Sequence, residues 1–120
     1  MDAVRTTVWS TVRLVGFHNW PDAHEARDYL RARHRHEFVF TAHVKVGHDD
    51  RDVEFHDLRD LIADWWAIDG PERGAASCER MARELADHLT EKHGLTVTRV
   101  DVSEDGYDGA TLEFGTPARH

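Results

Sequence analysis

The stretch RARHRHEFVF, Arg31 to Phe40, opens an apolar strand with two histidines placed two residues apart. Successive side chains of a strand point to opposite faces, so His34 and His36 share a face with the phenylalanines that follow them. Those phenylalanines belong in a core, which makes two imidazoles on the same face unusual. The pattern has two interpretations: histidines hydrogen-bonded to their neighbours at a strand entrance, or part of a metal site.

The alternation continues through HEFVFTAHVKVG and recurs upstream in TTVWSTVRLVGFHNW, so both segments are typical of half-buried strands. In the upstream segment, one face of the predicted strand carries Val8, Val12, Leu14, Gly16 and His18. An antiparallel pairing of the two strands would bring His18 within reach of His34 and His36. Three neutral imidazoles with an open fourth position are a ligand set of catalytic zinc sites.

The remaining segments supply a loop, two helices and two more strands. NWPDAHEARDYLRAR is polar and contains Pro21, which indicates a long loop with a helical turn near residues 26–30. A first helix is predicted from the apolar stripe of Leu58, Leu61, Ile62, Trp65 and Trp66. A second, with Ser77 as its cap and Gly94 at its end, carries the stripe of Cys78, Met81, Ala82, Leu85 and Leu89. LTVTRVDVS and ATLEFG are predicted strands joined by the turn EDGYDG.

The order strand, strand, helix, helix, strand, strand predicts an α+β domain, in which two helices cover one face of a four-stranded antiparallel sheet. The 120 residues suffice for a single domain over positions 1–120. Hydrophobic content of 40% and charged content of 32% are typical of a soluble globular protein. No apolar run approaches the ~18 residues that span a bilayer, and no apolar signal-peptide segment is expected near the N-terminus.

Charge and cysteine content narrow the class of partner and the compartment. The formal net charge of −8 argues against nucleic acid as the main partner. The single cysteine, Cys78, excludes an internal disulfide and favours a reducing compartment, so a cytoplasmic location is expected.

Five short segments along the chain together resemble one known family. They are LVGFH (14–18), HRHEF (34–38), VEFHDLRDLI (53–62), ASCERMARELADHL (76–89) and VDVSEDGYDGATLE (100–113). In this order and spacing they resemble motifs of the 6-pyruvoyl- and 6-carboxy-tetrahydropterin synthase family, of the tunnelling (T-fold) superfamily. The corresponding motifs are F-x-A-x-H, H-G-H-x-Y, V-I-D-F-x-D-L-K, P-T-x-E-N-L-A and V-x-V-x-E-T.

The resemblance implies a fold, a cofactor and a reaction class. It implies a T-fold that assembles through its sheets into barrels, as trimers or hexamers with the pocket between subunits. By position, His18, His34 and His36 would be zinc ligands, and Glu104 would grip the N–H and NH₂ edge of a pterin or purine-like ring. The implied activity is that of a zinc-dependent carbon–oxygen lyase acting on a pterin or a deazapurine precursor.

The departures from the family concern proton transfer. The family's cysteine, four residues before H-G-H, is replaced here by Leu30, and its Asp-His pair is missing from ADWWAIDGPERG. Other residues could take over proton transfer. The candidates for catalysis are His24 and Glu25 of the long loop and Asp69 of ADWWAIDGPERG. The same loop also offers Asp22 and Asp28. Each of these has a plainer interpretation as a solvated charge.

Two functions are therefore compatible with the sequence. The retained histidines favour an enzyme. The missing cysteine and histidine favour a non-catalytic protein that holds a pterin or purine nucleotide in the intersubunit pocket. Arg31, Arg33 and Arg35 could bind a phosphate chain in either case, or point outward from the strand. A third alternative is an interaction protein with a purely structural metal.

Overall fold

The computed structural model describes residues 4–115; the ends of the expected domain, 1–3 and 116–120, lie outside the described residues. The elements follow the predicted order, with a short 3₁₀ helix where a helical turn was expected. They are β1 (Thr7–His18), η1 (Glu25–Leu30), β2 (His34–Lys45), α1 (Phe55–Asp69), α2 (Cys78–His93), β3 (Thr96–Glu104) and β4 (Asp108–Glu113).

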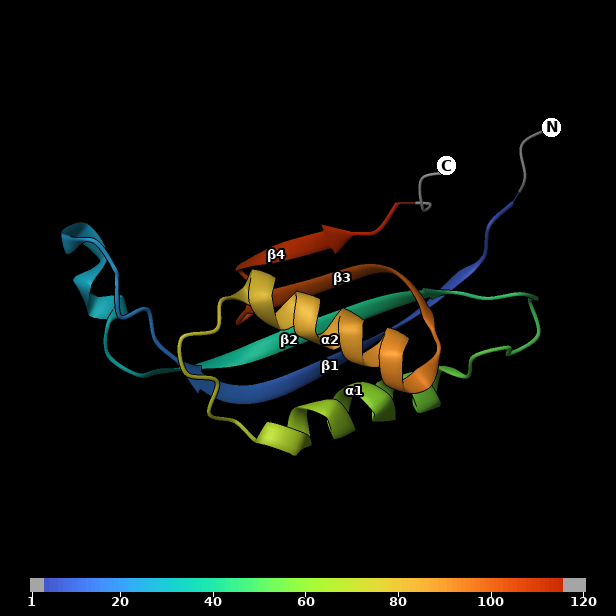
Figure 1. Cartoon of the computed structure of the whole chain (residues 1–120), viewed down its shortest axis with the longest axis horizontal. Coiled ribbons are helices and arrows are strands. Elements are labelled where there is room, and N and C mark those ends of the chain that lie inside the picture. The colour runs from blue at the N-terminus through green and yellow to red at the C-terminus, as the bar shows by residue number, and fades with distance from the viewer. Residues whose placement is uncertain (1–3, 116–120) are drawn as a thin grey trace.

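The four strands form one antiparallel sheet in the order β1-β2-β3-β4. Figure 1 shows α1 and α2 crossing the same face of this sheet, so the predicted α+β architecture is confirmed. The end of β1, the start of β2 and the N-terminal end of α2 lie at one end of the molecule, where the segment that contains η1 projects outward. The helices therefore cover one face, and three elements meet near a single end of the sheet.

The core lies between the sheet and the helices. This follows from the apolar residues, which recur every second position in the strands and every three to four positions in the helices. Alternate residues of β2 are fully buried, namely Phe38, Phe40, Ala42 and Val44. The helices oppose them with Leu58, Ile62, Trp65 and Trp66 from α1 and Met81, Ala82, Leu85 and Leu89 from α2. Burial of one such large apolar side chain contributes roughly 1.5–3 kcal/mol, so this layer supplies the main stabilising term.

Local signals set the helix ends. The Glu54 side chain accepts a hydrogen bond from the Asp57 N–H at the start of α1. The hydroxyl of Ser77 accepts from the Arg80 N–H at the start of α2, as predicted. Gly94 ends α2 with a φ of 64°, a left-handed conformation that glycine adopts without strain. These caps fix where α2 begins, next to the end of β1.

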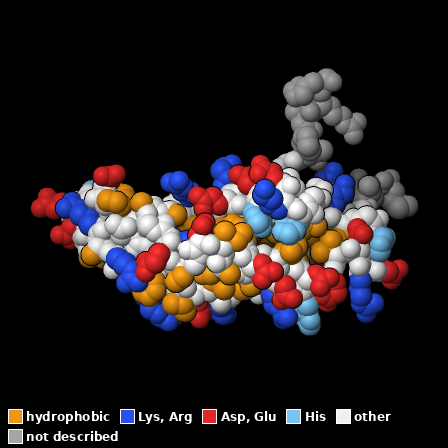
Figure 2. All heavy atoms as spheres, turned by 60° about the horizontal axis from the view of Figure 1, so that its bottom comes forward, with side chains coloured by type: hydrophobic (Ala, Val, Ile, Leu, Met, Phe, Trp, Pro, Cys, Tyr) orange, Lys and Arg blue, Asp and Glu red, His pale blue; other side chains and the backbone are white. Residues whose placement is uncertain are grey.

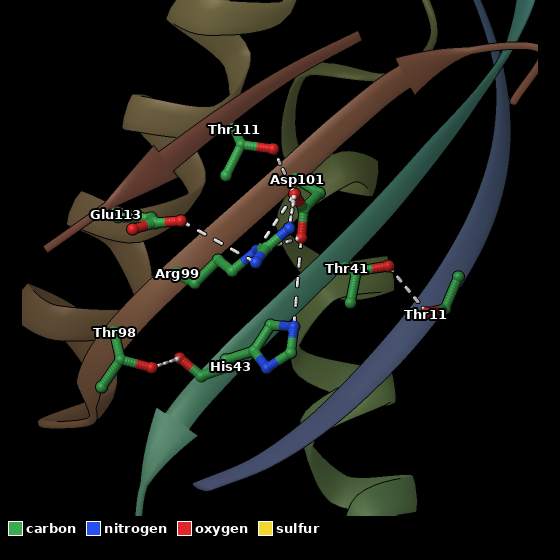
Figure 3. Close-up of polar contacts among 8 residues, drawn as sticks. All are labelled: Thr11, Thr41, His43, Thr98, Arg99, Asp101, Thr111 and Glu113. Carbon is green, nitrogen blue, oxygen red and sulfur yellow. Dashed lines mark hydrogen bonds and ion pairs between the residues drawn. The ribbon is translucent and has the colours of Figure 1, made fainter. Parts of the chain in front are cut away.

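The sheet face away from the helices carries many polar side chains, together with the exposed Trp9 of β1. Figure 3 shows Asp101 of β3 at the centre of a network on this face, where it accepts hydrogen bonds from Arg99 and from the Thr111 hydroxyl. His43 lies 3.9 Å from the same carboxylate, and the hydroxyls of Thr11 and Thr41 are 2.7 Å apart. Such a face suits contact with water better than burial against a second apolar layer.

The surface shows charges of both signs. On the face drawn in Figure 2, acidic and basic side chains are mixed among scattered hydrophobic ones. Within residues 4–115, no helix is long and apolar enough to cross a membrane.

Candidate metal centre and adjoining pocket

Three strands bring three histidines and one glutamate together. In the β1–β2 pairing His18 lies opposite His34, and Gly16 lies opposite His36. In the β2–β3 pairing Glu104 lies opposite Phe38, one position further along the same face. One nitrogen from each imidazole and one Glu104 oxygen all lie within 4.8 Å of one another. The sheet register therefore gathers side chains that are up to 86 positions apart in the chain.

Each imidazole has its Nδ1 held by an acceptor. Nδ1 of His18 donates to the Ala76 carbonyl at 2.9 Å, and Nδ1 of His34 donates to the Ala32 carbonyl at 2.9 Å. Nδ1 of His36 donates to the Asp105 carboxylate at 2.6 Å. An acceptor on Nδ1 orients the ring and leaves the Nε2 lone pair available, which is the arrangement found behind metal-bound histidines.

The Glu104 carboxylate lies among the Nε2 atoms. Its Oε2 is 3.2 Å from Nε2 of His18 and 3.1 Å from Nε2 of His36. The hydrogen bond between Glu104 and His18 raises the pKa of the imidazole and lowers the pKa of the carboxyl. The His18 imidazole therefore holds a proton more firmly than an isolated imidazole does, and a metal at Nε2 would compete with that proton.

His36 differs from His18 in its Nε2. This atom is buried, and within the described residues it has no hydrogen-bond partner, although Glu104 Oε2 is near. A buried polar atom without a partner costs about 1–3 kcal/mol, which a bound cation would relieve. Three imidazole nitrogens and one carboxylate oxygen suit zinc better than magnesium or calcium, which prefer oxygen ligands only. The residues present thus fit a zinc ion.

A pocket of about 510 Å³ adjoins the cluster, large enough for a small heterocycle. It is lined by His18, Asn19, Trp20, Leu30, His34, Ala75, Ala76, Ser77, Cys78, Glu79, Glu104, Asp108 and Gly109. The backbone N–H of Trp20 donates to the Leu30 carbonyl at 2.7 Å and joins the two ends of the long loop. Trp20 and Leu30 therefore form an apolar wall close to the imidazoles.

The cysteine expected in the core also borders this pocket. Cys78 is 8% exposed, packs in the hydrophobic cluster and contributes to the pocket lining from the first turn of α2. Burial, followed by the nearby carboxylate of Glu104, raises the pKa of its thiol to about 12. The thiol is thus a poor proton acceptor near neutral pH.

The three catalytic candidates His24, Glu25 and Asp69 lie outside the pocket. His24 and Glu25 are exposed at the start of η1, where the His24 ring contacts the Trp20 ring edge-to-face at 5.6 Å. Asp69 is exposed at the end of α1, 4.0 Å from Arg73. Among the described residues that line the pocket, none of these three is present.

The arginines of the opening stretch have protein partners. Arg33 forms a bidentate ion pair with Glu72, and its guanidinium lies 3.7 Å from the centroid of the Phe17 ring. Nε of Arg31 donates to the Ala23 carbonyl at 2.8 Å, while Arg35 is exposed. In this arrangement Arg31 and Arg33 tie the loop and the α1–α2 connection to the site.

Two supports of the site were not expected from the sequence. The segment between α1 and α2 pairs with the end of β1 through hydrogen bonds of Phe17 to Pro71 and Arg73, and this segment leads to the Ala76 carbonyl that holds His18. Asp105 has a φ of 58°, a left-handed conformation that Asp tolerates better than most residues. One carboxylate oxygen of Asp105 accepts from Nδ1 of His36, and the other accepts from the Glu37 N–H at 2.8 Å. In the sequence, the signal for this support was an acidic residue directly after Glu104 in a predicted tight turn.

The fold belongs to the T-fold class: two helices on one face of a four-stranded antiparallel sheet, with the histidine cluster at one end. Within that class the chain is similar to 6-pyruvoyl tetrahydropterin synthase of Caenorhabditis elegans, with a TM-score of 0.62, 11% identity, and coverage of 96% of this chain and 99% of that chain. It is also similar to an uncharacterized protein of Wolinella succinogenes, with a TM-score of 0.59, 13% identity, and coverage of 92% and 99%. No family model and no curated protein matches the sequence. At these identities the likeness shows the fold.

Proposed function

We propose that this chain is a zinc-dependent enzyme of the carbon–oxygen lyase type that acts on a pterin or on a purine-like compound such as a deazapurine precursor. The observation that carries the proposal is the orientation of three imidazoles beside a pocket of ring size. His18, His34 and His36 each have Nδ1 held by an acceptor, which leaves three Nε2 atoms for one zinc ion. The likeness of the fold to a solved 6-pyruvoyl tetrahydropterin synthase supports this reaction class.

The roles of the other residues follow from their chemistry. Zinc, when bound, would supply a Lewis acid that polarises hydroxyl or carbonyl oxygens of the substrate side chain. Glu104 would accept hydrogen bonds from the N–H and NH₂ groups of the ring edge, because a carboxylate pairs with such an edge through two bonds. Trp20 and Leu30 would contact the apolar face of the ring.

A second function, binding without turnover, is favoured by one observation. The described pocket lining contains Leu30 where the resembling enzymes have cysteine, and it lacks His24, Glu25 and Asp69. Cys78 borders the pocket, but its high pKa disfavours proton abstraction near neutral pH. In this alternative the pocket holds a pterin or purine nucleotide unchanged.

One experiment separates the two functions. The zinc-loaded protein is incubated with dihydroneopterin triphosphate and with purine nucleotides, and all species are identified by mass spectrometry. The enzyme predicts a product with an altered side chain from the wild type and none from His36→Ala. Recovery of intact ligand in a stoichiometric complex would instead support the binding protein for those compounds.

We further propose that the protein is a cytoplasmic homo-oligomer, a trimer or hexamer, with the pocket completed by a neighbouring subunit. The pocket includes Asp108 and Gly109 at the start of β4, an edge strand of the sheet, so a second subunit could reach it. The free thiol of Cys78 suits a reducing compartment. The charge of −8 and the mixed surface of Figure 2 support a small-molecule partner over nucleic acid or membrane.

A further inference from the structure

The distances from Glu104 to two of the three imidazoles, those of His18 and His36, match the spacing of neighbouring ligands around a metal ion. Two ligands that are each about 2.0–2.1 Å from a tetrahedral zinc ion lie roughly 3.3 Å apart. Glu104 Oε2 is 3.2 Å from Nε2 of His18 and 3.1 Å from Nε2 of His36. From this match we infer that Glu104 is the fourth metal ligand in the ligand-free protein, which closes the site until a ligand displaces the carboxylate.

Charge balance supports the same assignment. Three neutral imidazoles leave both positive charges of a zinc ion uncompensated, and the side chains of His18 and His36 are only 11% and 21% exposed. A carboxylate among the ligands removes half of that charge. Asp105, the other acid that contacts His36, is already engaged, because its two oxygens accept from Nδ1 of His36 and from the Glu37 N–H. Glu104 is therefore the carboxylate that is free to reach the metal.

The inference deepens the proposed function and rests on it. As a ring anchor alone, Glu104 would need both oxygens directed at the N–H and NH₂ groups of the ring. In the structure one oxygen is directed at the imidazoles instead. The two roles would be compatible if they followed one another: Glu104 would hold the metal in the ligand-free protein and would accept hydrogen bonds from the ring edge once a ligand is bound. The site would then prefer ligands that carry both an N–H and NH₂ ring edge and an oxygen that can bind the metal.

The test compares metal binding by the wild type, Glu104→Gln and Glu104→Ala. The matched control is Glu37→Gln, which removes a carboxylate next to His36 that points to the opposite sheet face and pairs with Arg13. Zinc affinity is measured by competition with a chromophoric chelator, and the coordination number is read from the visible absorption of the cobalt-substituted protein. Circular dichroism of the metal-free proteins verifies that each variant is folded.

We expect both Glu104 variants to bind zinc at least about tenfold more weakly, since even residues behind metal ligands change affinity 10–100-fold. Their cobalt spectra should change in intensity as water replaces the carboxylate, whereas Glu37→Gln should match the wild type. Wild-type affinity and an unchanged cobalt spectrum in both Glu104 variants would overturn the inference and leave the proposed function standing. Failure of the wild type itself to bind zinc would overturn both.

Discussion

At the scale of single residues, the three histidines of the cluster differ in the group that holds each Nδ1. His18 and His34 depend on backbone carbonyls, which side-chain substitution cannot remove directly. His36 depends on the carboxylate of Asp105, at 2.6 Å. A negatively charged acceptor makes the opposite nitrogen more basic and so a stronger metal ligand. Asp105 is therefore the support of the proposed zinc site that can be tested by a single substitution.

Replacing Asp105 with asparagine should lower the zinc affinity about tenfold, because the change removes the charge behind His36. Asparagine tolerates the left-handed backbone at this position as well as aspartate does, so the turn should be retained. The measurement is chelator competition, with Asp50→Asn, an exposed aspartate in the turn between β2 and α1, as the control. Equal zinc affinities in wild type and Asp105→Asn would show that Asp105 has no part in metal binding.

Cys78 should react slowly with iodoacetamide in the folded protein. Only the thiolate is nucleophilic, and a thiol with a pKa of about 12 is almost entirely protonated at pH 8. We expect alkylation at pH 8 to be roughly a hundredfold or more slower than in urea-unfolded protein, and to accelerate as the pH rises. Mass spectrometry measures the extent of alkylation over time. Rapid modification of the native protein at pH 8 would show that this thiol is not buried.

At the scale of elements, the alternation of apolar residues predicted which faces of β1 and β2 meet the helices, and therefore that His18, His34 and His36 share a side. It did not predict the register, because pairing across residues 19–33 depends on contacts distant in sequence. The fourth strand was expected from Ala110 and begins at Asp108, since the close approach of Gly109 to the backbone of β3 extends the pairing. The contact of Asp105 with His36 depends on the conformation of the turn between β3 and β4, which amino-acid composition alone does not specify.

Gly16 shows how tightly β1 packs against α1. A Cβ at this position would lie 2.6 Å from Cζ2 of Trp66, inside the buried aromatic cluster. Gly16→Ala should therefore destabilise the protein by about 1–3 kcal/mol in urea unfolding, the usual cost of overpacking. Gly115, where a Cβ would meet nothing within 4 Å, provides the control, and Gly115→Ala should change stability by less than about 0.5 kcal/mol. Equal stability of the two variants would show that the ring of Trp66 does not pack closely against Gly16.

At the scale of the whole molecule, the sheet has one covered face and two outer strands, β1 and β4. The outer edge of β1 is already paired near Phe17 with the segment around Pro71 and Arg73, so only its remaining length is available to another chain. The uncovered face carries a network of polar side chains, part of which Figure 3 shows, and such a network suits a water-filled barrel interior. In the proposed assembly each chain would thus contribute this sheet face to the barrel interior, and its pocket would lie next to the β4 edge.

The proposed assembly predicts a mass of three or six times the 13.8 kDa chain. Light scattering coupled to size-exclusion chromatography measures it directly, with the concentration varied to detect dissociation. A mass equal to one chain over the whole concentration range would contradict a trimer or hexamer.

The zinc site proposed for His18, His34 and His36 can be tested by metal analysis of the purified protein. The measurement compares the zinc content of the wild type with that of His34→Ala and His36→Ala, after confirming that all three are folded. We expect about one zinc per chain in the wild type and a loss of most of it in both variants, because each substitution removes one nitrogen ligand. Equal, near-zero zinc in all three proteins would show that these histidines do not form a zinc site.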